Sequence, residues 1–357
     1  MVKESAITVT EGQVPNLPPP SGTAVNSAMR PPAPDETAAI DQPIDLRKRF
    51  LNLRTLISLL IAMLTFYTVM RFLGVDFPKT LDAMKRVALP LYLTAFFVYA
   101  LTFPIRGLRW KRLLNNVGLD AKVSVLSETI LLSWFVNCVA PAKLGDLYRG
   151  YLMRRNERFP LTTTLATIFA ERIIDSAALF IILSVGLILS ASKIAPGLEG
   201  KIILIAGTFV AVLLLMLAVM HWHGRRVIRF FPAQLHDIYD RFSSGAFASF
   251  QKLPWIAVLT FLAWACEYGR LFIVTRAMGV DIAPASVMVV LSGAALLLTV
   301  PTPGGIGVVE VGLASLLILF GVNNDVALAV ALLDRVISYW ALIATGLPLY
   351  IFSKRTR

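Results

Sequence analysis

The feature that most restricts the fold of this chain is a series of long apolar runs, most of them close to the roughly 20 residues that cross a bilayer as a helix. The runs lie near residues 55–73, 87–105, 123–141, 162–190, 202–220, 254–275, 286–320 and 327–352. The chain is 57% hydrophobic and 16% charged, and its mean hydropathy of +0.71 exceeds that of soluble domains. The sequence therefore predicts an all-α integral membrane protein, built as a polytopic helical bundle.

The first 46 residues differ in composition from the rest of the chain. They contain VPNLPPP and RPPAPDE, with almost no apolar periodicity, so they cannot bury a core. They also lack the positive-then-apolar order of a signal peptide, and we expect the first membrane helix to stay in the mature protein. The predicted organisation is a disordered Pro-rich cytoplasmic tail over residues 1–46 and a polytopic membrane domain over residues 47–357.

Two of the apolar runs are interrupted by the same kind of break, VAPAKLGD at Val139–Asp146 and VPTPGGIG at Val300–Gly307. The sequence around each break half-repeats. Pro141 matches Pro303 and Gly145 matches Gly307 at an offset of 162, NVGLD from Asn116 matches AMGVD from Ala277 at 161, and Glu171-Arg172 matches Asp334-Arg335 at 163. A break repeated inside apolar sequence points to the binding site of a transporter.

Basic residues beside the helix ends predict the orientation, because cytoplasmic loops carry an excess of Lys and Arg. The net charge of +12 is concentrated in short segments rather than in a patch suited to nucleic acid. These segments are Arg47–Arg54, Arg106–Arg112, Arg149–Arg158, Arg225–Arg229 and Lys354–Arg357. If all five are cytoplasmic loops or tails, both termini are cytoplasmic, the first break enters from the cytoplasmic face and the second enters from the outer face.

This assignment predicts two inverted repeats, about residues 87–190 and 254–352, each with a Pro/Gly-broken re-entrant hairpin. Non-helical backbone at membrane depth is tolerated only where protein buries it or water reaches it, so the two tips predict a cavity. If the hairpins span the membrane fully instead, the number of membrane helices rises from six towards eight or more.

Charged residues also lie inside the predicted membrane helices, where each costs several kcal/mol unless it is paired or hydrated. Glu171, Arg172 and Asp175 occur in IFAERIIDS, and Asp334-Arg335 occupies the matching place in the second half. The spacing of three predicts that Arg172 pairs with Asp175. These charges either bind substrate or lock helices together, and we favour binding, with Arg172 and Arg335 as phosphate contacts because a guanidinium holds phosphate through two bonds.

The tips add backbone N–H groups and helix N-termini, which favour an anionic head group. The candidate binding residues are Pro141, Lys143, Gly145, Asp146 and Arg149 at the first break and Pro303, Gly304, Gly305, Gly307 and Glu310 at the second. The spacing of Asp146 and Arg149 also suits a pair, as does that of Glu267 and Arg270, where packing is an equal alternative. Taken alone, a Pro/Gly cluster fits an ordinary interhelical loop better than a binding site.

Other chemistries have little support in the sequence. His221 and His223, with only His236 elsewhere, do not make a metal site, and Cys138 and Cys266 fit small membrane-buried side chains. The chain has no Ser-His-Asp set, P-loop or Rossmann fingerprint. We therefore expect no cofactor, no enzyme activity and no ATP-driven transport by this chain alone.

Five motifs in order resemble a known family. They are RGLRWKRLL, FVNCVAPAKLGDLYRGYLMRR, ATIFAERIIDS, PTPGGIGVVE and LLDRVISYW, and they span roughly residues 50–352. This string resembles the transmembrane region of the lysylphosphatidylglycerol synthases, also called flippase-like proteins. In full-length synthases a soluble aminoacyl transferase domain follows the membrane part, which flips the product lipid. Because this chain ends at Arg357, the resemblance implies a stand-alone lipid-translocating module.

The leading hypothesis is a flippase of the bacterial inner membrane that moves an anionic or polyprenyl/hopanoid-type lipid between leaflets. A second hypothesis is an intramembrane transferase acting on a lipid phosphate, with Glu171 or Asp334 as general base. A third is a non-catalytic membrane partner of a lipid-biosynthetic enzyme, with the Pro-rich tail as the contact. Membrane lipids are the expected partners in all three.

Overall fold

The computed structural model describes residues 66–72, 74–139, 144–191, 198–223, 234–298 and 303–353, with single residues at 64, 228, 355 and 356. The predicted tail, most of the first apolar run, Pro141 and Lys143 lie outside the described residues. The described segments are helices joined by short turns, without a β-strand. The all-α fold predicted from the apolar runs is confirmed.

Four helices in this part of the chain are long and apolar enough to cross a membrane. They are α4 (Leu89–Asn116), α7 (Leu161–Leu189), α11 (Leu253–Ala277) and the continuous segment Asn324–Phe352. The last segment consists of α14 (Asn324–Arg335), a π-helical turn (Val336–Trp340) and α15 (Ala341–Phe352). All four overlap predicted apolar runs.

The two broken runs form helix–break–helix hairpins. The first pairs α5 (Val123–Val139) with α6 (Gly145–Glu157). The second pairs α12 (Pro284–Leu297) with α13 (Val308–Leu319), with a short 3-10 turn at Pro303–Gly305 between them. Each arm is shorter than the roughly 20 residues that span a bilayer, as a re-entrant hairpin requires.

Further helices of the described residues are a short helical stretch at residues 66–72, α3 (Phe77–Lys85), α8 (Leu198–Trp222) and α10 (Gln234–Ser249). α8 is a long apolar helix between the two hairpins in the chain, and its Leu204 and Leu215 side chains are exposed, as lipid-facing residues are. α10 packs along the beginning of α7, where Gly245 lies against Ala166.

The helices match in order across the two halves of the chain, with α4, α5, α6 and α7 answered by α11, α12, α13 and the segment α14–α15. α5 and α12 begin at Val123 and Pro284, and α6 and α13 begin at Gly145 and Val308. Both separations agree with the offset of the sequence motifs. α7 and Asn324–Phe352 are both 29 residues long. The match extends the sequence half-repeat to whole elements.

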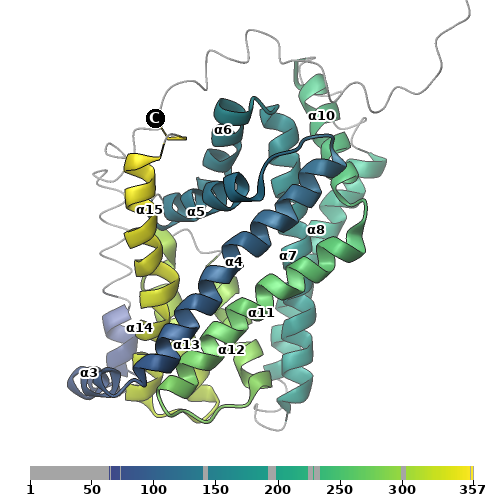
Figure 1. The fold of residues 1–357 in the computed structure, drawn as a ribbon. Helices are drawn as coiled ribbons and strands as arrows, with labels where there is room; N and C mark the ends of the chain where they lie inside the picture. The colour runs from purple at the N-terminus through teal and green to yellow at the C-terminus, as the bar shows by residue number, and fades with distance from the viewer. Residues whose placement is uncertain are drawn as a thin grey trace, which may run out of the picture.

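The two sets run in opposite directions where they meet. α4 and α11 lie side by side (Figure 1), and the start of α4 is at the end of α11, because the amide of Ala88 donates to the carbonyl of Ala277 at 2.8 Å. At the other end, the Asn116 side chain donates to the carbonyl of Gln251 at 2.6 Å. This antiparallel arrangement is what inverted repeats require, and their inversion across a membrane stays a prediction.

One prediction from the basic residues is wrong. The segment Arg106–Arg112 was expected to be a cytoplasmic loop, yet α4 continues through it to Asn116. Arg106, Arg109 and Trp110 are buried inside the bundle. Carboxylates of other helices pair with the guanidinium groups of Arg106 and Arg109. This stretch of α4 can therefore be buried.

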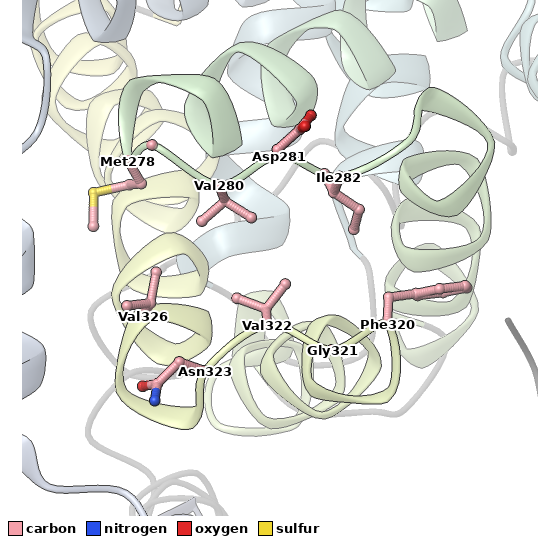
Figure 2. Close-up of a pocket in the computed structure, with 10 residues that line it drawn as sticks. Met278, Val280, Asp281, Ile282, Phe320, Gly321, Val322, Asn323 and Val326 are labelled. Carbon is pink, nitrogen blue, oxygen red and sulfur yellow. The ribbon is translucent and has the colours of Figure 1, made fainter.

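The turns that follow α11 and α13 have the same construction. Gly279 and Gly321 have φ angles of 70° and 85°, and the amides of Val280 and Val322 donate back to carbonyls in the preceding helix at 2.9 and 3.1 Å, as in a Schellman cap. The two turns face each other across a shallow cleft of about 300 Å³ lined mainly by apolar side chains (Figure 2). None of the predicted site residues lines this cleft.

Candidate functional site

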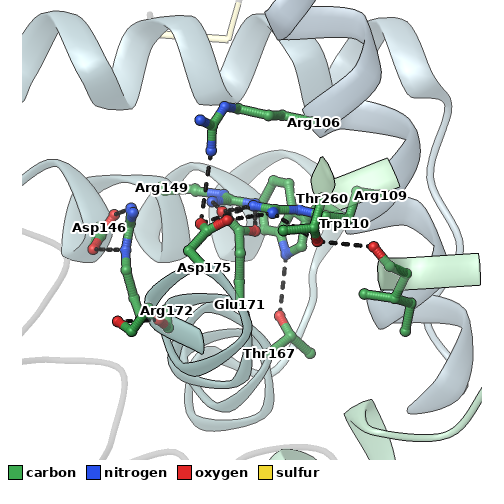
Figure 3. Close-up of polar contacts among 12 residues, drawn as sticks. Arg106, Arg109, Trp110, Asp146, Arg149, Thr167, Glu171, Arg172, Asp175 and Thr260 are labelled. Atoms are coloured by element: carbon green, nitrogen blue, oxygen red, sulfur yellow. Dashed lines mark hydrogen bonds and ion pairs between the residues drawn. The ribbon is translucent and has the colours of Figure 1, made fainter. Parts of the chain in front are cut away.

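Eight charged side chains of alternating sign form one continuous series through the interior, which we call the buried charge chain. In order of contact its members are Arg149, Glu171, Arg109, Asp175, Arg106, Glu267, Arg270 and Asp334. All eight are buried, and Figure 3 shows the first five. Four positive and four negative groups cancel, which lets the series exist in an apolar interior.

Near the start of the buried charge chain, two arginines hold the carboxylate of Glu171. Arg149 on α6 donates to both oxygens of Glu171 at 3.1 and 2.9 Å, and Arg109 on α4 lies 3.0 Å from the same carboxylate. The Arg149 guanidinium also lies over the indole ring of Trp110, 3.5 Å from its centroid. These contacts fix α4, α6 and α7 to one another, and they satisfy Glu171 fully.

Asp175, one turn beyond Glu171, is held in the same way. Arg109 donates to its two oxygens at 2.5 and 3.0 Å and also donates to the Thr260 hydroxyl at 3.1 Å. The predicted pairing of Arg172 with Asp175 is therefore wrong. Arg172 points to a different side of α7, because a spacing of three along a helix leaves a choice of partners on neighbouring helices.

The second half repeats the central contact. Arg270 on α11 binds the Asp334 carboxylate on α14, as Arg109 on α4 reaches Glu171 on α7. Arg270 also donates to Glu267 at 3.3 Å, which confirms the pair expected from their spacing. The arginine and the acid both recur at the offsets of the flanking sequence motifs, so the half-repeat preserves an ion pair as well as the helices.

Two arginine–acid pairs at the breaks lie outside the buried charge chain. The first joins Arg172 to Asp146. Arg172 donates to the two oxygens of Asp146 at 3.0 and 2.7 Å, joining α7 to the first turn of α6. Their side chains are 40% and 28% exposed. The predicted Asp146–Arg149 pair is wrong, because Asp146 binds Arg172 and Arg149 binds Glu171. Arg172 is thus a fixed guanidinium that solvent or a ligand can reach.

The second arginine–acid pair, Arg335 with Glu310, occupies the matching place. Arg335 donates to Glu310 in the first turn of α13 at 2.8 Å and to the carbonyl of Gly304 at 2.6 Å. The two side chains are only 7% and 11% exposed. One oxygen of Glu310 has no partner among the described residues. The two matched pairs therefore differ in access, the first being open and the second closed.

The two breaks meet inside the molecule. The Tyr339 hydroxyl donates to the carbonyl of Cys138, at the end of α5, at 3.2 Å. A Cβ atom placed on Gly304 would overlap the Tyr339 ring and lie 3.3 Å from the Cα of Cys138. Only glycine allows this approach of the second tip to the first. The two tips, which the sequence predicts to line a cavity, are therefore in direct contact at this point.

The remaining glycines of the breaks shape the hairpins. Gly145 donates its amide to the Asn137 side chain at 2.8 Å and accepts from the Ser133 hydroxyl at 2.8 Å, so it packs the arms of the first hairpin together. Gly305 and Gly307 have φ angles of 72° and 81°, which turn the chain into α13, and Pro303 begins the 3-10 turn before them. The amide of Gly145 is occupied and therefore cannot serve the predicted anion contact.

The structure thus divides the predicted site residues by role. Glu171, Asp175, Asp334 and Arg149 belong to the buried charge chain, whereas Arg172, Asp146, Arg335, Glu310 and Gly304 form the two arginine–acid pairs at the breaks. The sequence interpretation missed Arg106 and Arg109, and it treated Glu267 and Arg270 as one more pair with packing as an equal alternative. A usable signal existed, since Arg109 and Arg270 are related by the same offset as the NVGLD and AMGVD motifs.

The arrangement is better suited to holding an anion than to acid–base chemistry. The Glu171 and Asp334 carboxylates are buried and each is occupied by a guanidinium, so neither faces an open position where a substrate could meet it. The described residues contain no group of three or more His, Cys, Asp or Glu side chains placed to hold a metal. Arg172 offers both charge and access.

Comparison with known proteins agrees with this architecture. Residues 53–346 match the family described as the lysylphosphatidylglycerol synthase TM region. A UPF0104 membrane protein of the archaeon Methanothermobacter thermautotrophicus is 26% identical over 277 residues, covering 71% of this chain and 80% of the relative. One from Methanocaldococcus jannaschii is 28% identical over 226 residues, covering 62% and 95%.

A third relative carries a transferase name. The glycosyltransferase AglD of Haloferax volcanii is 27% identical over 297 residues, which are 72% of this chain and 48% of that protein. The family match covers most of the chain and includes both hairpins, the buried charge chain and both arginine–acid pairs. This chain is a membrane protein that belongs to the lysylphosphatidylglycerol synthase TM region family.

Proposed function

We propose that this protein moves a lipid with an anionic head group between the leaflets of the membrane, using Arg172 and Arg335 in turn as the head-group contacts. The observation that carries the proposal is the recurrence of one arginine–acid pair at the same place in both helix sets, open in one set and closed in the other. Transporters built from inverted repeats alternate access by moving one repeat against the other, and one open and one closed member of a matched pair support such a movement here.

Arg172 suits a phosphate for a specific reason. Asp146 already holds the guanidinium through two bonds, so the side chain is oriented before a ligand arrives, and its 40% exposure leaves part of the fork open. Binding by a pre-oriented group avoids the entropy of ordering a free arginine. Charge-assisted bonds to a phosphate are also among the strongest that proteins form.

Arg335 is closed by its contact with Gly304 and by the Tyr339–Cys138 bond. In the alternate state these two contacts separate, Arg335 gains the access that Arg172 has here, and Arg172 is covered. The substrate class is an anionic or polyprenyl/hopanoid-type lipid, and in its phosphate-bearing members the phosphate is the recognised group. We place the protein in the bacterial inner (cytoplasmic) membrane with both termini in the cytoplasm.

The test is lipid transfer in vesicles that contain the purified protein and a fluorescent phosphatidylglycerol, with a dithionite quench reporting the outer leaflet. Wild type should expose the inner-leaflet label, and Arg172→Ala and Arg335→Ala should each slow transfer about tenfold or more, the rate equivalent of a lost charged hydrogen bond. The matched control is Arg112→Ala, an exposed arginine of α4 outside both pairs, which should transfer at the wild-type rate.

A labelled phosphatidylcholine in the same vesicles tests the preference for net negative charge. The proposal fails if wild type moves none of the lipids, or if both pair variants match Arg112→Ala. Comparing the lipids of a deletion strain with those of its parent then identifies the natural cargo.

A second candidate function is transfer chemistry on a lipid phosphate, favoured by the relative that is named a glycosyltransferase. In this case Glu171 or Asp334 would act as the base after release from its arginine. A lipid product of changed mass, formed by the purified protein and lost in Asp334→Asn, would favour transfer over translocation.

A further inference from the structure

Arg106 occupies the centre of the buried charge chain and differs from the other arginines in how it is held. Its terminal nitrogens lie 3.6 Å from an oxygen of Asp175 and 3.6 Å from an oxygen of Glu267. Both separations exceed the length of a charged hydrogen bond, whereas each of the other three arginines of the series has at least one carboxylate within hydrogen-bond distance. Arg106 is therefore midway between two carboxylates and fully bonded to neither.

The two carboxylates do not depend on Arg106. Asp175 already accepts two bonds from Arg109, and Glu267 accepts one from Arg270. The buried charge chain thus consists of two firmly bonded parts, and Arg106 links them. Leaving either carboxylate would not strand an unpaired acid, which is the usual cost of breaking a buried ion pair.

The surroundings of Arg106 allow a sideways movement of its head. The guanidinium lies 4.9 Å from the ring centroid of Trp134 on α5 and 5.7 Å from that of Trp264 on α11. Aromatic faces attract a guanidinium without fixing its position along the ring. Trp134 belongs to the first hairpin, so a movement of this hairpin also shifts one side of the Arg106 site.

Each carboxylate leads to one of the arginine–acid pairs. Asp175 lies one turn from Arg172 on the same helix, at the first pair. Glu267 leads through Arg270 to Asp334, the residue before Arg335 of the second pair. In the half-repeat the position of Arg106 corresponds to Glu267 itself, at the offset that also relates Arg109 to Arg270. The contact therefore joins equivalent points of the two helix sets.

From these contacts we propose that Arg106 is a positioning residue that bonds alternately to Asp175 and to Glu267, and so links opening of one arginine–acid pair to closing of the other. The proposal rests on the transport function proposed above. A ligand-driven change needs a two-state element that both sites bias, and the midway guanidinium supplies it. In each end state Arg106 forms a full hydrogen-bonded pair with one carboxylate and releases the other.

The test uses two variants of matched chemistry, Asp175→Asn and Glu267→Gln, each of which removes one of the two carboxylate charges. Hydrogen–deuterium exchange of the full chain in phosphatidylglycerol nanodiscs reports opening at the first turn of α6 (residues 145–149) and of α13 (residues 308–312). In each variant, exchange at the two turns should change in opposite directions by about fivefold, with the signs reversed between the variants.

A purely structural role predicts a different pattern, in which both variants speed exchange at both turns together. That result, or no change at either turn, overturns the proposal. Arg106→Gln provides the second check, because it removes the exchanging group and leaves both carboxylates paired. Adding Glu267→Gln to Arg106→Gln should then produce no further opposite shift, and a persisting opposite shift would also overturn the proposal.

The readout separates this proposal from the lipid function. Opposite shifts in a protein that moves no lipid would leave the exchange of Arg106 standing and remove its assigned cargo. Lipid transfer by a wild-type protein whose variants show no opposite shifts would leave the transport function standing and exclude the exchange.

Discussion

The hydroxyl of Tyr339 donates a 3.2 Å hydrogen bond to the backbone carbonyl of Cys138. This bond connects the π-helical turn of the last long segment to the end of α5, the first arm of the first hairpin. The same ring packs against Gly304 of the second break, where an added Cβ would overlap it, and lies 4.7 Å from the Arg335 guanidinium. One tyrosine therefore contacts both broken segments, and its bond holds the two breaks together.

Replacing Tyr339 by Phe should loosen this contact while keeping the ring. The change removes one buried hydrogen bond and leaves the Cys138 carbonyl unsatisfied, which costs about 1–3 kcal/mol. We expect faster amide exchange over the last turn of α5 and a lower melting temperature. Tyr92→Phe is the control, since Tyr92 donates a similar 2.9 Å bond to the carbonyl of Leu333 on α14 and not to α5, and equal effects of both variants at α5 would contradict this assignment.

Gly304→Ala should be far more disruptive than Gly279→Ala, although both glycines have positive φ angles, of 56° and 70°. A Cβ at Gly279 would meet open space, so only backbone strain of about 1–2 kcal/mol is expected. At Gly304 the added carbon overlaps Tyr339 and separates the breaks. Thermal unfolding in detergent measures both, and a loss at Gly304 no larger than that at Gly279 would show that the tips do not need close contact.

The buried and exposed carboxylates should respond differently to loss of charge. Glu171→Gln leaves Arg149 and Arg109 without their shared acid in the interior, which costs about 3–5 kcal/mol. Asp146→Asn releases the partly exposed Arg172 and costs about 1 kcal/mol or less. Melting temperatures of the two variants compare these effects directly. Similar melting-temperature shifts in the two variants would mean that the buried charge chain contributes no more to stability than the exposed pair does.

Arg355→Ala should loosen the base of the first hairpin. Arg355 lies 3.0 Å from Glu128 on α5 and 3.4 Å from Glu157 on α6, so one side chain joins the outer ends of both arms. The pairs are partly exposed, and the expected loss is about 1 kcal/mol, visible as faster exchange over both helix ends. Arg276→Ala, which removes an exposed pair with Asp281, should leave these two regions unchanged.

Much of the helical framework could be predicted from sequence because the membrane leaves few alternatives for an apolar run of spanning length. The offset of the half-repeat located both hairpins and the Asp334-Arg335 counterpart of Glu171-Arg172. These predictions used spacing and hydropathy, which the sequence states directly. The positions of the breaks between helical arms followed from Pro and Gly in the same way.

The pairing of the charges could not be predicted in the same way. Arg172 was expected to bind Asp175 on its own helix but binds Asp146 on α6, because interhelical partners depend on helix rotation and approach. Arg109 was assigned to a loop, since basic residues next to an apolar run have the same appearance whether they face water or a buried acid. Burial of Arg109 depends on Glu171 and Asp175, which lie on α7, beyond the whole of the first hairpin.

The neutrality of the buried charge chain has a consequence for energetics. A membrane potential does work of about 2.3 kcal/mol per elementary charge per 100 mV, and on this neutral series it does work only through the short shift of Arg106 between its two carboxylates. The machinery would then contribute little gating charge of its own. Under the proposed function, the voltage dependence of transfer by the reconstituted protein would measure the charge of the transported lipid.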